Sequence, residues 1–141
     1  MVSDEDREAI QDTRKQLAAA LRLAARHNLH EAVCNHFSVM VGRSSDMFLV
    51  NPPNVHWSLM RASDLLLVGN DGQLIEGCVA PEPTSFFIHS RIHRSDPRAV
   101  CVMHTHMPYA TAITVVEGGA PGAGQPDSST RICADGVRRK L

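Results

Sequence analysis

The chain has 141 residues and a mass of 15.4 kDa, a size typical of one domain that buries a core. Its 14 basic and 15 acidic residues give a net charge of −1, which argues against binding nucleic acid or an anionic membrane by bulk electrostatics. No apolar run approaches the roughly 20 residues of a membrane span, and the acidic N-terminus is unlike a signal peptide. The four cysteines are widely spaced, as in reduced proteins, and a cytoplasmic location is therefore predicted.

Apolar residues recur at spacings that predict both helices and short strands. Ile10, Leu17 and Leu21 lie on one face of an amphipathic helix, which is predicted from residue 3 to about residue 28. Two pairs of short β-prone runs flank turn-forming residues and predict hairpins. The elements after the first helix are two hairpins, a helix, a buried strand and the start of another helix: 37–41 with 47–50, 64–68 with 73–75, 84–94, 99–104 and 108–116.

The segment 119–141 differs in character from the rest of the chain. It is rich in Gly, Ala, Pro and Arg and shows no hydrophobic period. One interpretation is a disordered tail. The other is a sequence translated out of frame. Arginine greatly outnumbers lysine, which is typical of a gene rich in G and C, and a frameshift in such a gene yields this composition. The predicted division is therefore a folded portion over 1–118 and a tail over 119–141.

The motif His104-Thr105-His106 ends the predicted strand that begins at Ala99. Side chains alternate along a strand, so both imidazoles project from the same face and can reach one metal ion. The alternative is a pair of partly buried histidines bonded to backbone carbonyls. A metal site also needs a third ligand, which the motif alone does not provide.

Two other groups of polar residues have both a structural and a functional interpretation. His89 and His93 share one face of a predicted helix, where their apolar neighbours favour a supporting role over metal ligation. Asn35 and Ser38 lie between the first helix and the first strand, where their side chains either hold a small anion or form a turn. No phosphate-binding loop and no nucleophile-elbow motif is present in the sequence.

Taken in order, the segments of this chain resemble the class II aldolase and adducin family over about residues 10–118. The resemblance rests on Asn35-His36-Phe37-Ser38, FLVNPPNVHW (48–57), SDLLLV (63–68), DGQLIEG (71–77) and FFIHSRIHRSDPRAVCVMHTH (86–106). It implies an α/β fold in which aldolase-like α/β/α layers surround a largely antiparallel sheet. It also implies that the C-terminal part of the family's domain is missing from this chain, through truncation or a frameshift.

The same resemblance implies which residues form the site. In the family, the histidines that correspond to His104 and His106 bind a divalent metal, usually zinc, which polarises a carbonyl and stabilises an enediolate. Asn35 and Ser38 would hold the substrate anion, with His89 nearby in support. The expected partner is a small hydroxy-carbonyl substrate, with neither nucleic acid nor membrane, and the family forms homo-oligomers.

Three departures from the family pattern bear on the chemistry. Ser85 occupies the place of the family's catalytic glutamate, and a serine does not accept a proton near neutral pH unless another base activates it. The run 51–54 (Asn-Pro-Pro-Asn) replaces a phosphate-binding Thr-Pro-Ser-Gly, and the family's third metal histidine lies beyond the matching portion.

We therefore expect a metal-dependent aldolase-like lyase that is impaired in this chain, with zinc bound weakly or not at all and the catalytic base unassigned. Two alternatives stay open. One is a non-catalytic, adducin-like binding module, which Ser85 favours. The other is an inert fragment, which the missing third ligand favours.

Overall fold

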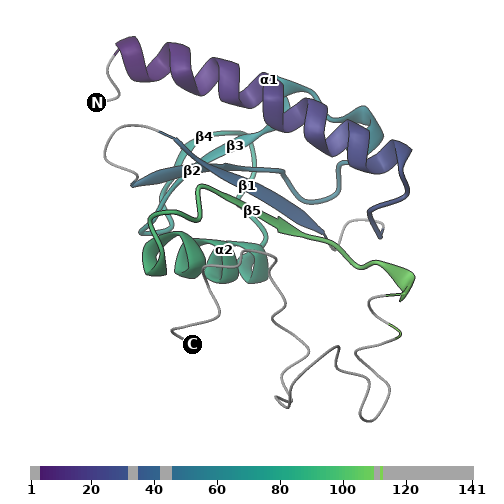
Figure 1. The fold of residues 1–141 in the computed structure, drawn as a ribbon. Coiled ribbons are helices and arrows are strands. Elements are labelled where there is room, and N and C mark those ends of the chain that lie inside the picture. The colour runs from purple at the N-terminus through teal and green to yellow at the C-terminus, as the bar shows by residue number, and fades with distance from the viewer. Residues whose placement is uncertain (1–3, 32–34, 42–45, 110–111, 113–141) are drawn as a thin grey trace.

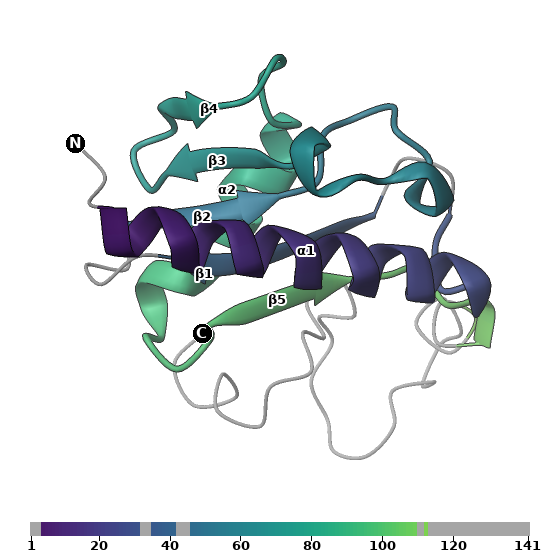
Figure 2. The same ribbon diagram turned by 90° about the horizontal axis from the view of Figure 1, so that it is seen from above.

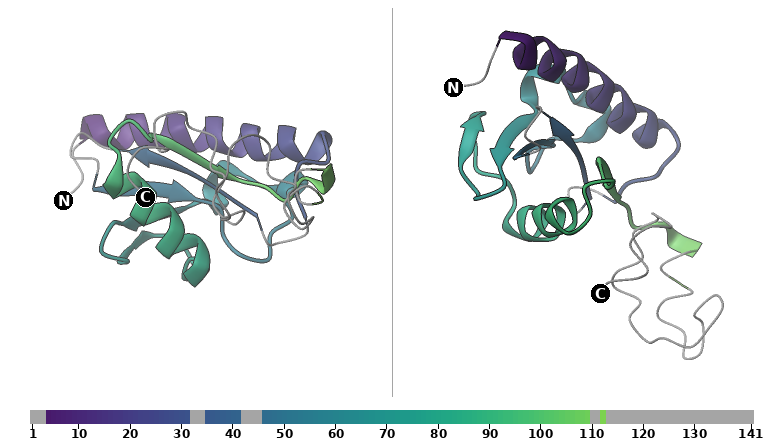
Figure 3. Two further views of the ribbon diagram at one scale, coloured as in Figure 1. Left: turned by 60° about the horizontal axis from the view of Figure 1, so that its bottom comes forward. Right: turned by 60° about the vertical axis from the view of Figure 1, so that its left-hand side comes forward.

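The computed structural model describes residues 4–31, 35–41, 46–109 and 112, which form a five-stranded sheet with a helix on each face. Helix α1 (Asp4–Arg26) lies along one face and helix α2 (Pro83–Ser95) along the other (Figure 1). The right-hand view of Figure 3 shows these three layers from the end. The strands are β1 (His36–Val41), β2 (Met47–Val50), β3 (Leu66–Gly69), β4 (Leu74–Glu76) and β5 (Cys101–His104), and the 3₁₀ helices η1 (Trp57–Leu59) and η2 (Ala62–Asp64) lie between β2 and β3.

The strands follow the order β4-β3-β2-β1-β5, and every neighbouring pair is antiparallel. β1 is therefore flanked on one side by β2, its neighbour in sequence, and on the other by β5, which comes much later in the chain. In the β1–β5 pairing, His36 lies opposite His104 and Ser38 lies opposite Val102. Residues that lie opposite each other project from the same face of the sheet. This register thus places two histidines side by side at one end of the sheet.

Helix α1 packs on the sheet through one apolar face. Ile10, Leu17 and Leu21 are buried and recur at the spacing of a single helical face. Figure 2 shows α1 in front of the sheet, running in roughly the same direction as the strands. The core on this side of the sheet consists of Ile10, Leu17, Ala18, Leu21, Ala24, Ala25, Phe37, Val41, Leu49, Trp57, Met60, Leu65 and Leu67. This core fixes the end of α1 against the sheet.

Helix α2 covers the opposite face of the sheet. It begins after Glu82, whose carboxylate accepts a hydrogen bond of 2.7 Å from the backbone N–H of Ser85. Pro83 occupies the first turn, where the missing N–H would have no helical partner. A second core of Phe48, Val50, Leu66 and Val68, joined by Met40, Leu74 and Phe86, lies on this side. The α2 face also receives the polar side chains of β1.

The observed elements confirm the predicted first helix, both hairpins, the second helix and the α/β/α layers around an antiparallel sheet. The strand expected over 99–104 is present as β5, but the expectation that it is buried is wrong, because β5 lies at the edge of the described sheet and its Cys101 and Met103 are exposed. Most boundaries shift by one or two residues. The second hairpin was expected to begin at Asp64, but this residue ends η2, where its carboxylate accepts a hydrogen bond from the backbone N–H of Arg61. The predicted helix over 108–116 falls largely outside the described residues, and the segment 119–141 does so entirely. Neither α1 nor α2 has the length and apolarity that crossing a bilayer requires.

Candidate functional site

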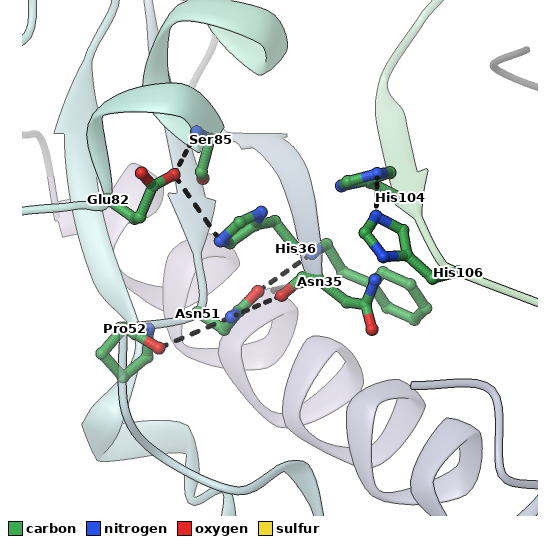
Figure 4. Close-up of polar contacts among 9 residues, drawn as sticks. Asn35, His36, Asn51, Pro52, Glu82, Ser85, His104 and His106 are labelled. Atoms are coloured by element: carbon green, nitrogen blue, oxygen red, sulfur yellow. Dashed lines mark hydrogen bonds and ion pairs between the residues drawn. The ribbon is translucent and has the colours of Figure 1, made fainter. Parts of the chain in front are cut away.

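Polar side chains gather at one end of the sheet, on the face that α2 covers. His36 begins β1, His104 ends β5, and Ser85 comes from the first turn of α2. The rings of His36 and His104 are stacked, with centroids 6.1 Å apart and planes 23° apart. In Figure 4, Glu82 and Ser85 lie on one side of His36, and His104 and His106 lie on the other. The β1–β5 pairing therefore assembles one site from distant parts of the sequence.

His104 and His106 direct their Nε2 atoms toward each other. The two nitrogens are 3.0 Å apart, and both side chains are partly buried. For comparison, two nitrogens that bind one tetrahedral zinc ion at about 2.0–2.1 Å lie about 3.3 Å from each other. Burial, and secondarily the neighbouring His106, lower the pKa of His104, which favours the neutral imidazole that binds metals. The structure thus brings together the two residues that the sequence predicts as metal ligands.

A carboxylate outside the predicted motif contacts this pair. Oε2 of Glu31, which follows α1, lies 2.8 Å from Nδ1 of His106. An ionised carboxylate only accepts hydrogen bonds, so Nδ1 of His106 carries the proton. In neutral His106 the lone pair is then on Nε2, the atom that faces His104.

His36 lies at the centre of the site. Its ring contacts that of His89 edge-on, with centroids 6.1 Å apart, and its Nε2 is 3.9 Å from Oε2 of Glu82. Burial lowers the pKa of His36, the carboxylate of Glu82 opposes this, and the neighbouring His104 and His106 lower the pKa further. His36 is therefore a neutral imidazole near neutral pH, with polar groups on both sides.

Ser38 lies deeper, between two histidines of α2. Its Oγ is 2.6 Å from Nδ1 of His89 and 2.7 Å from Nε2 of His93. Nδ1 of His93 in turn lies 2.6 Å from the carbonyl oxygen of Ala99. Because that carbonyl accepts, His93 is protonated on Nδ1, Ser38 donates to its Nε2, and Ser38 accepts a hydrogen bond from His89. The hydroxyl of Ser38 thus has two protein partners, and the lone pair of His89 is on Nε2.

Three buried polar atoms of the site have no hydrogen-bond partner among the described residues. They are Nε2 of His36, Nε2 of His89 and Oγ of Ser85. Burial, with smaller contributions from the nearby imidazoles, lowers the pKa of His89 to about 3, so this ring stays neutral. Unpartnered buried polar atoms are rare in proteins and often mark functional positions. The carboxylate nearest to Ser85 is that of Glu82, which accepts from its backbone N–H.

The charge state of Glu82 follows from competing effects. Burial by itself would raise the pKa of this carboxyl group. Hydrogen bonds from the backbone of Ser85 and from the backbone and side chain of Thr84, together with the proximity of His36, lower it below its ordinary value. Glu82 is therefore an ionised carboxylate at neutral pH.

Asn35 and Asn51 tie the start of β1 to its surroundings. The side-chain oxygen of Asn35 accepts a hydrogen bond from the backbone N–H of Glu31, and its Nδ2 has no partner among the described residues. Asn51 accepts from the backbone N–H of Phe37 at 2.9 Å and donates to the carbonyl of Asn35 at 3.3 Å. Both amides are buried, and one N–H₂ group remains available for an additional acceptor.

Comparison with known proteins identifies the family. The model of the family described as Class II Aldolase and Adducin N-terminal domain matches residues 15–137. The chain belongs to this family. The meiotically up-regulated gene 14 protein of Schizosaccharomyces pombe is 35% identical over 101 residues, which are 71% of this chain and 39% of that protein. An adducin-related protein of the same organism is 33% identical over 114 residues, 76% of this chain and 35% of that protein.

A solved structure shows the same fold as this member of the class II aldolase and adducin family. The L-fuculose 1-phosphate aldolase from Glaciozyma antarctica PI12 superimposes with a TM-score of 0.69 and 30% sequence identity. The superposition covers 81% of this chain and 46% of that aldolase. The chain therefore spans less than half the length of these relatives.

Two of the described side chains offer the kind of ligand atom that a divalent metal takes, as the class II aldolases of this family generally use one. Nε2 atoms of His104 and His106 converge, and imidazole nitrogen is a donor that zinc accepts. No group of three or more His, Cys, Asp or Glu side chains within 4–31, 35–41, 46–109 and 112 is arranged to hold an ion. The described part of this aldolase-family chain thus provides a convergent pair of donors.

Three residues of the site were not among the predicted site residues: Glu31, His36 and Glu82. Glu31 lies between α1 and β1 with no motif around it, so its contact with His106 depends on the fold alone. His36 had a signal in the sequence, because it shares the period-two face of β1 with Ser38. Glu82 lies one helical turn before Ser85, among prolines, and the sequence therefore predicts a poor substitute for the family's glutamate, whereas the structure brings its Oε2 to 3.9 Å from Nε2 of His36.

Proposed function

We propose that this chain carries part of a metal-dependent aldolase-like site that acts on a small hydroxy-carbonyl compound. The observation that supports it most is the 3.0 Å approach of Nε2 of His104 to Nε2 of His106 at the end of β5. Family membership and the aldolase fold support this reaction class. A cytoplasmic location belongs to the same proposal.

A divalent ion bound by His104 and His106 would act as a Lewis acid that polarises a carbonyl oxygen. The remaining work falls to side chains that hold the substrate and accept a proton from it. Ser85 occupies the place of the family's glutamate, and its hydroxyl is not a base near neutral pH. Glu82 is the ionised carboxylate that lies next to Ser85 and faces His36, and we assign proton transfer to it.

The proposed substrate lacks a phosphate group. The sequence 51–54 departs from the family's phosphate-binding pattern, and the side chain of Asn51 is fully occupied by backbone partners. Asn35 has a buried Nδ2 without a described partner, which suits a substrate carboxylate or carbonyl oxygen. Ser38 would act indirectly, because its hydroxyl already bonds His89 and His93.

A second candidate is a non-catalytic, adducin-like binding module. Two observations favour it, namely Ser85 at the position of the catalytic glutamate and the adducin-related protein among the relatives. In this alternative the fold persists, while proton transfer is lost.

Proton exchange separates the two candidates. We would incubate the chain with Zn²⁺ and dihydroxyacetone in D₂O and follow by NMR the loss of the carbon-bound protons next to the carbonyl. An aldolase-like site exchanges these protons faster than a double variant with His104→Ala and His106→Ala. A binding module gives the same rate for both proteins.

A further inference from the structure

The end of α1 and the end of β5 are joined by one hydrogen bond between side chains 75 positions apart. Oε2 of Glu31 lies 2.8 Å from Nδ1 of His106. The Glu31 side chain is 67% exposed and that of His106 is 35% exposed. An ion pair this exposed contributes little to the stability of a fold. The main effect of this contact is therefore on the imidazole of His106.

Contacts of Glu31 and of the residue before it hold the backbone at this point, and this fixes the position from which the carboxylate extends. Its N–H donates to the side-chain oxygen of Asn35. The preceding residue, His30, stacks on Trp57 with ring centroids 5.7 Å apart, and its Nε2 lies 2.8 Å from Nε2 of His56. These contacts anchor the segment after α1 against the start of β1 and against η1.

The contact with Glu31 decides where the proton of His106 resides. A carboxylate accepts only, so Nδ1 carries a proton, and Nε2 is the ring nitrogen that faces His104. Two nitrogens 3.0 Å apart repel each other unless a proton or a cation lies between them. The carboxylate also adds a negative charge next to the ring. This charge makes Nε2 a stronger electron-pair donor and favours the binding of a cation at that atom.

We propose that Glu31 is a positioning residue for a divalent cation: it fixes the proton of His106 on Nδ1 and thereby presents Nε2 as a ligand atom beside Nε2 of His104. This inference rests on the proposed function, in which those two nitrogens bind the metal. Metal-binding histidines commonly donate their second ring N–H to a carboxylate, and loss of such a partner lowers metal affinity about 10- to 100-fold.

The first test titrates the full chain with Co²⁺ and follows the visible absorption that ligand nitrogens induce. Glu31→Ala removes both charge and acceptor, and we expect it to weaken Co²⁺ binding about 10- to 100-fold. Glu31→Gln keeps an acceptor oxygen and should lie between Glu31→Ala and the unaltered chain. Glu8→Gln, on the exposed side of α1, is the matched control and should bind like the unaltered chain. Equal affinities for all four proteins would overturn the proposal.

The second test needs no metal. The ¹⁵N shifts of His106 distinguish a protonated from an unprotonated ring nitrogen, and we expect Nδ1 to be protonated at pH 8. In Glu31→Ala the proton should redistribute between the two ring nitrogens, while the urea midpoint of unfolding stays unchanged. An unprotonated Nδ1 in the unaltered chain, or no change in Glu31→Ala, would contradict the proposal.

The two tests separate this inference from the proposed function. If Co²⁺ binds neither the unaltered chain nor any variant, the proposed metal site is wrong, and the role of Glu31 in binding falls with it. If Co²⁺ binds and the double variant with His104→Ala and His106→Ala abolishes binding, the site is supported. The Glu31 variants then decide the positioning role alone.

Discussion

The hydroxyl of Ser38 in β1 lies 2.6 Å from Nδ1 of His89 in α2 and links that ring to His93, 2.7 Å away on the same side. One small side chain thus bonds one nitrogen of each of two buried imidazoles. Ser38→Ala should leave Nδ1 of His89 and Nε2 of His93 without a partner, and we expect a loss of about 1–3 kcal/mol in the free energy of unfolding. Urea unfolding measures it, with Ser63→Ala, at an exposed position of η2, as the control. Equal midpoints for both variants would refute the network's contribution.

Stability should fall as the pH falls below about 6.5. Burial lowers the pKa of His89 to about 3, and it also lowers the pKa values of His36 and His93. Between pH 6.5 and pH 3 the unfolded chain therefore binds protons that the folded chain does not, so stability rises with pH in this window. His89 alone changes it by about 1 kcal/mol per pH unit in this window, and His36 and His93 act in the same direction. His89→Gln should flatten the dependence in urea unfolding between pH 5 and pH 7; an unchanged slope would contradict it.

The purified chain should hold zinc weakly and lose it on dialysis, because two imidazoles leave a tetrahedral ion short of protein ligands. Metal analysis before and after dialysis tests this, with His27→Ala, an exposed histidine, as the control for the double variant of His104 and His106. Stoichiometric zinc that survives dialysis would mean that a further residue binds it.

Exchange activity, if present, should depend on Glu82 and not on Ser85. Glu82→Gln removes the ionised carboxylate beside His36, and we expect the exchange rate to fall by about 10²-fold, the size of a general-base contribution. Ser85→Ala should change it little, and neither protein should cleave sugar phosphates. A loss of exchange in Ser85→Ala with Glu82→Gln unaffected would reverse the assignment.

Deletion of residues 119–141 should leave the free energy of unfolding unchanged, because the segment has no hydrophobic period with which to pack. Urea unfolding of the full and shortened chains, with limited proteolysis, measures this. A shortened chain that unfolds more easily would show that the segment packs on the domain.

Local patterns explain why most elements could be predicted. Ile10, Leu17 and Leu21 determine the buried face of α1, and each hairpin joins strands that are neighbours in sequence. The β1–β5 pairing could not be predicted this way, because no local sequence pattern indicates that His36 lies opposite His104. Those strands meet only through the whole fold.

The same distinction applies to single side chains. His104 and His106 were predicted as a pair because strand alternation relates them directly. Glu31 was not predicted as a site residue, because its partner His106 lies 75 positions away in the sequence. The burial of Arg14 was not predicted, because this charged residue lies on the apolar face of α1. Its guanidinium donates to the carbonyl of Leu65 and pairs with Glu76 at 2.8 Å.

The position of β1 between β2 and β5 also sets an order of events during synthesis. The β1–β2 and β3–β4 hairpins close over short stretches and can form early, whereas β5 must bridge a long intervening segment to reach β1, at a greater entropic cost. On the ribosome, strands β1 to β4 can therefore be in place before His104 has emerged. A nascent chain at that stage has strands β1 to β4 but lacks the strand that completes the histidine cluster, so among the described strands the one that brings His104 is the last to be added.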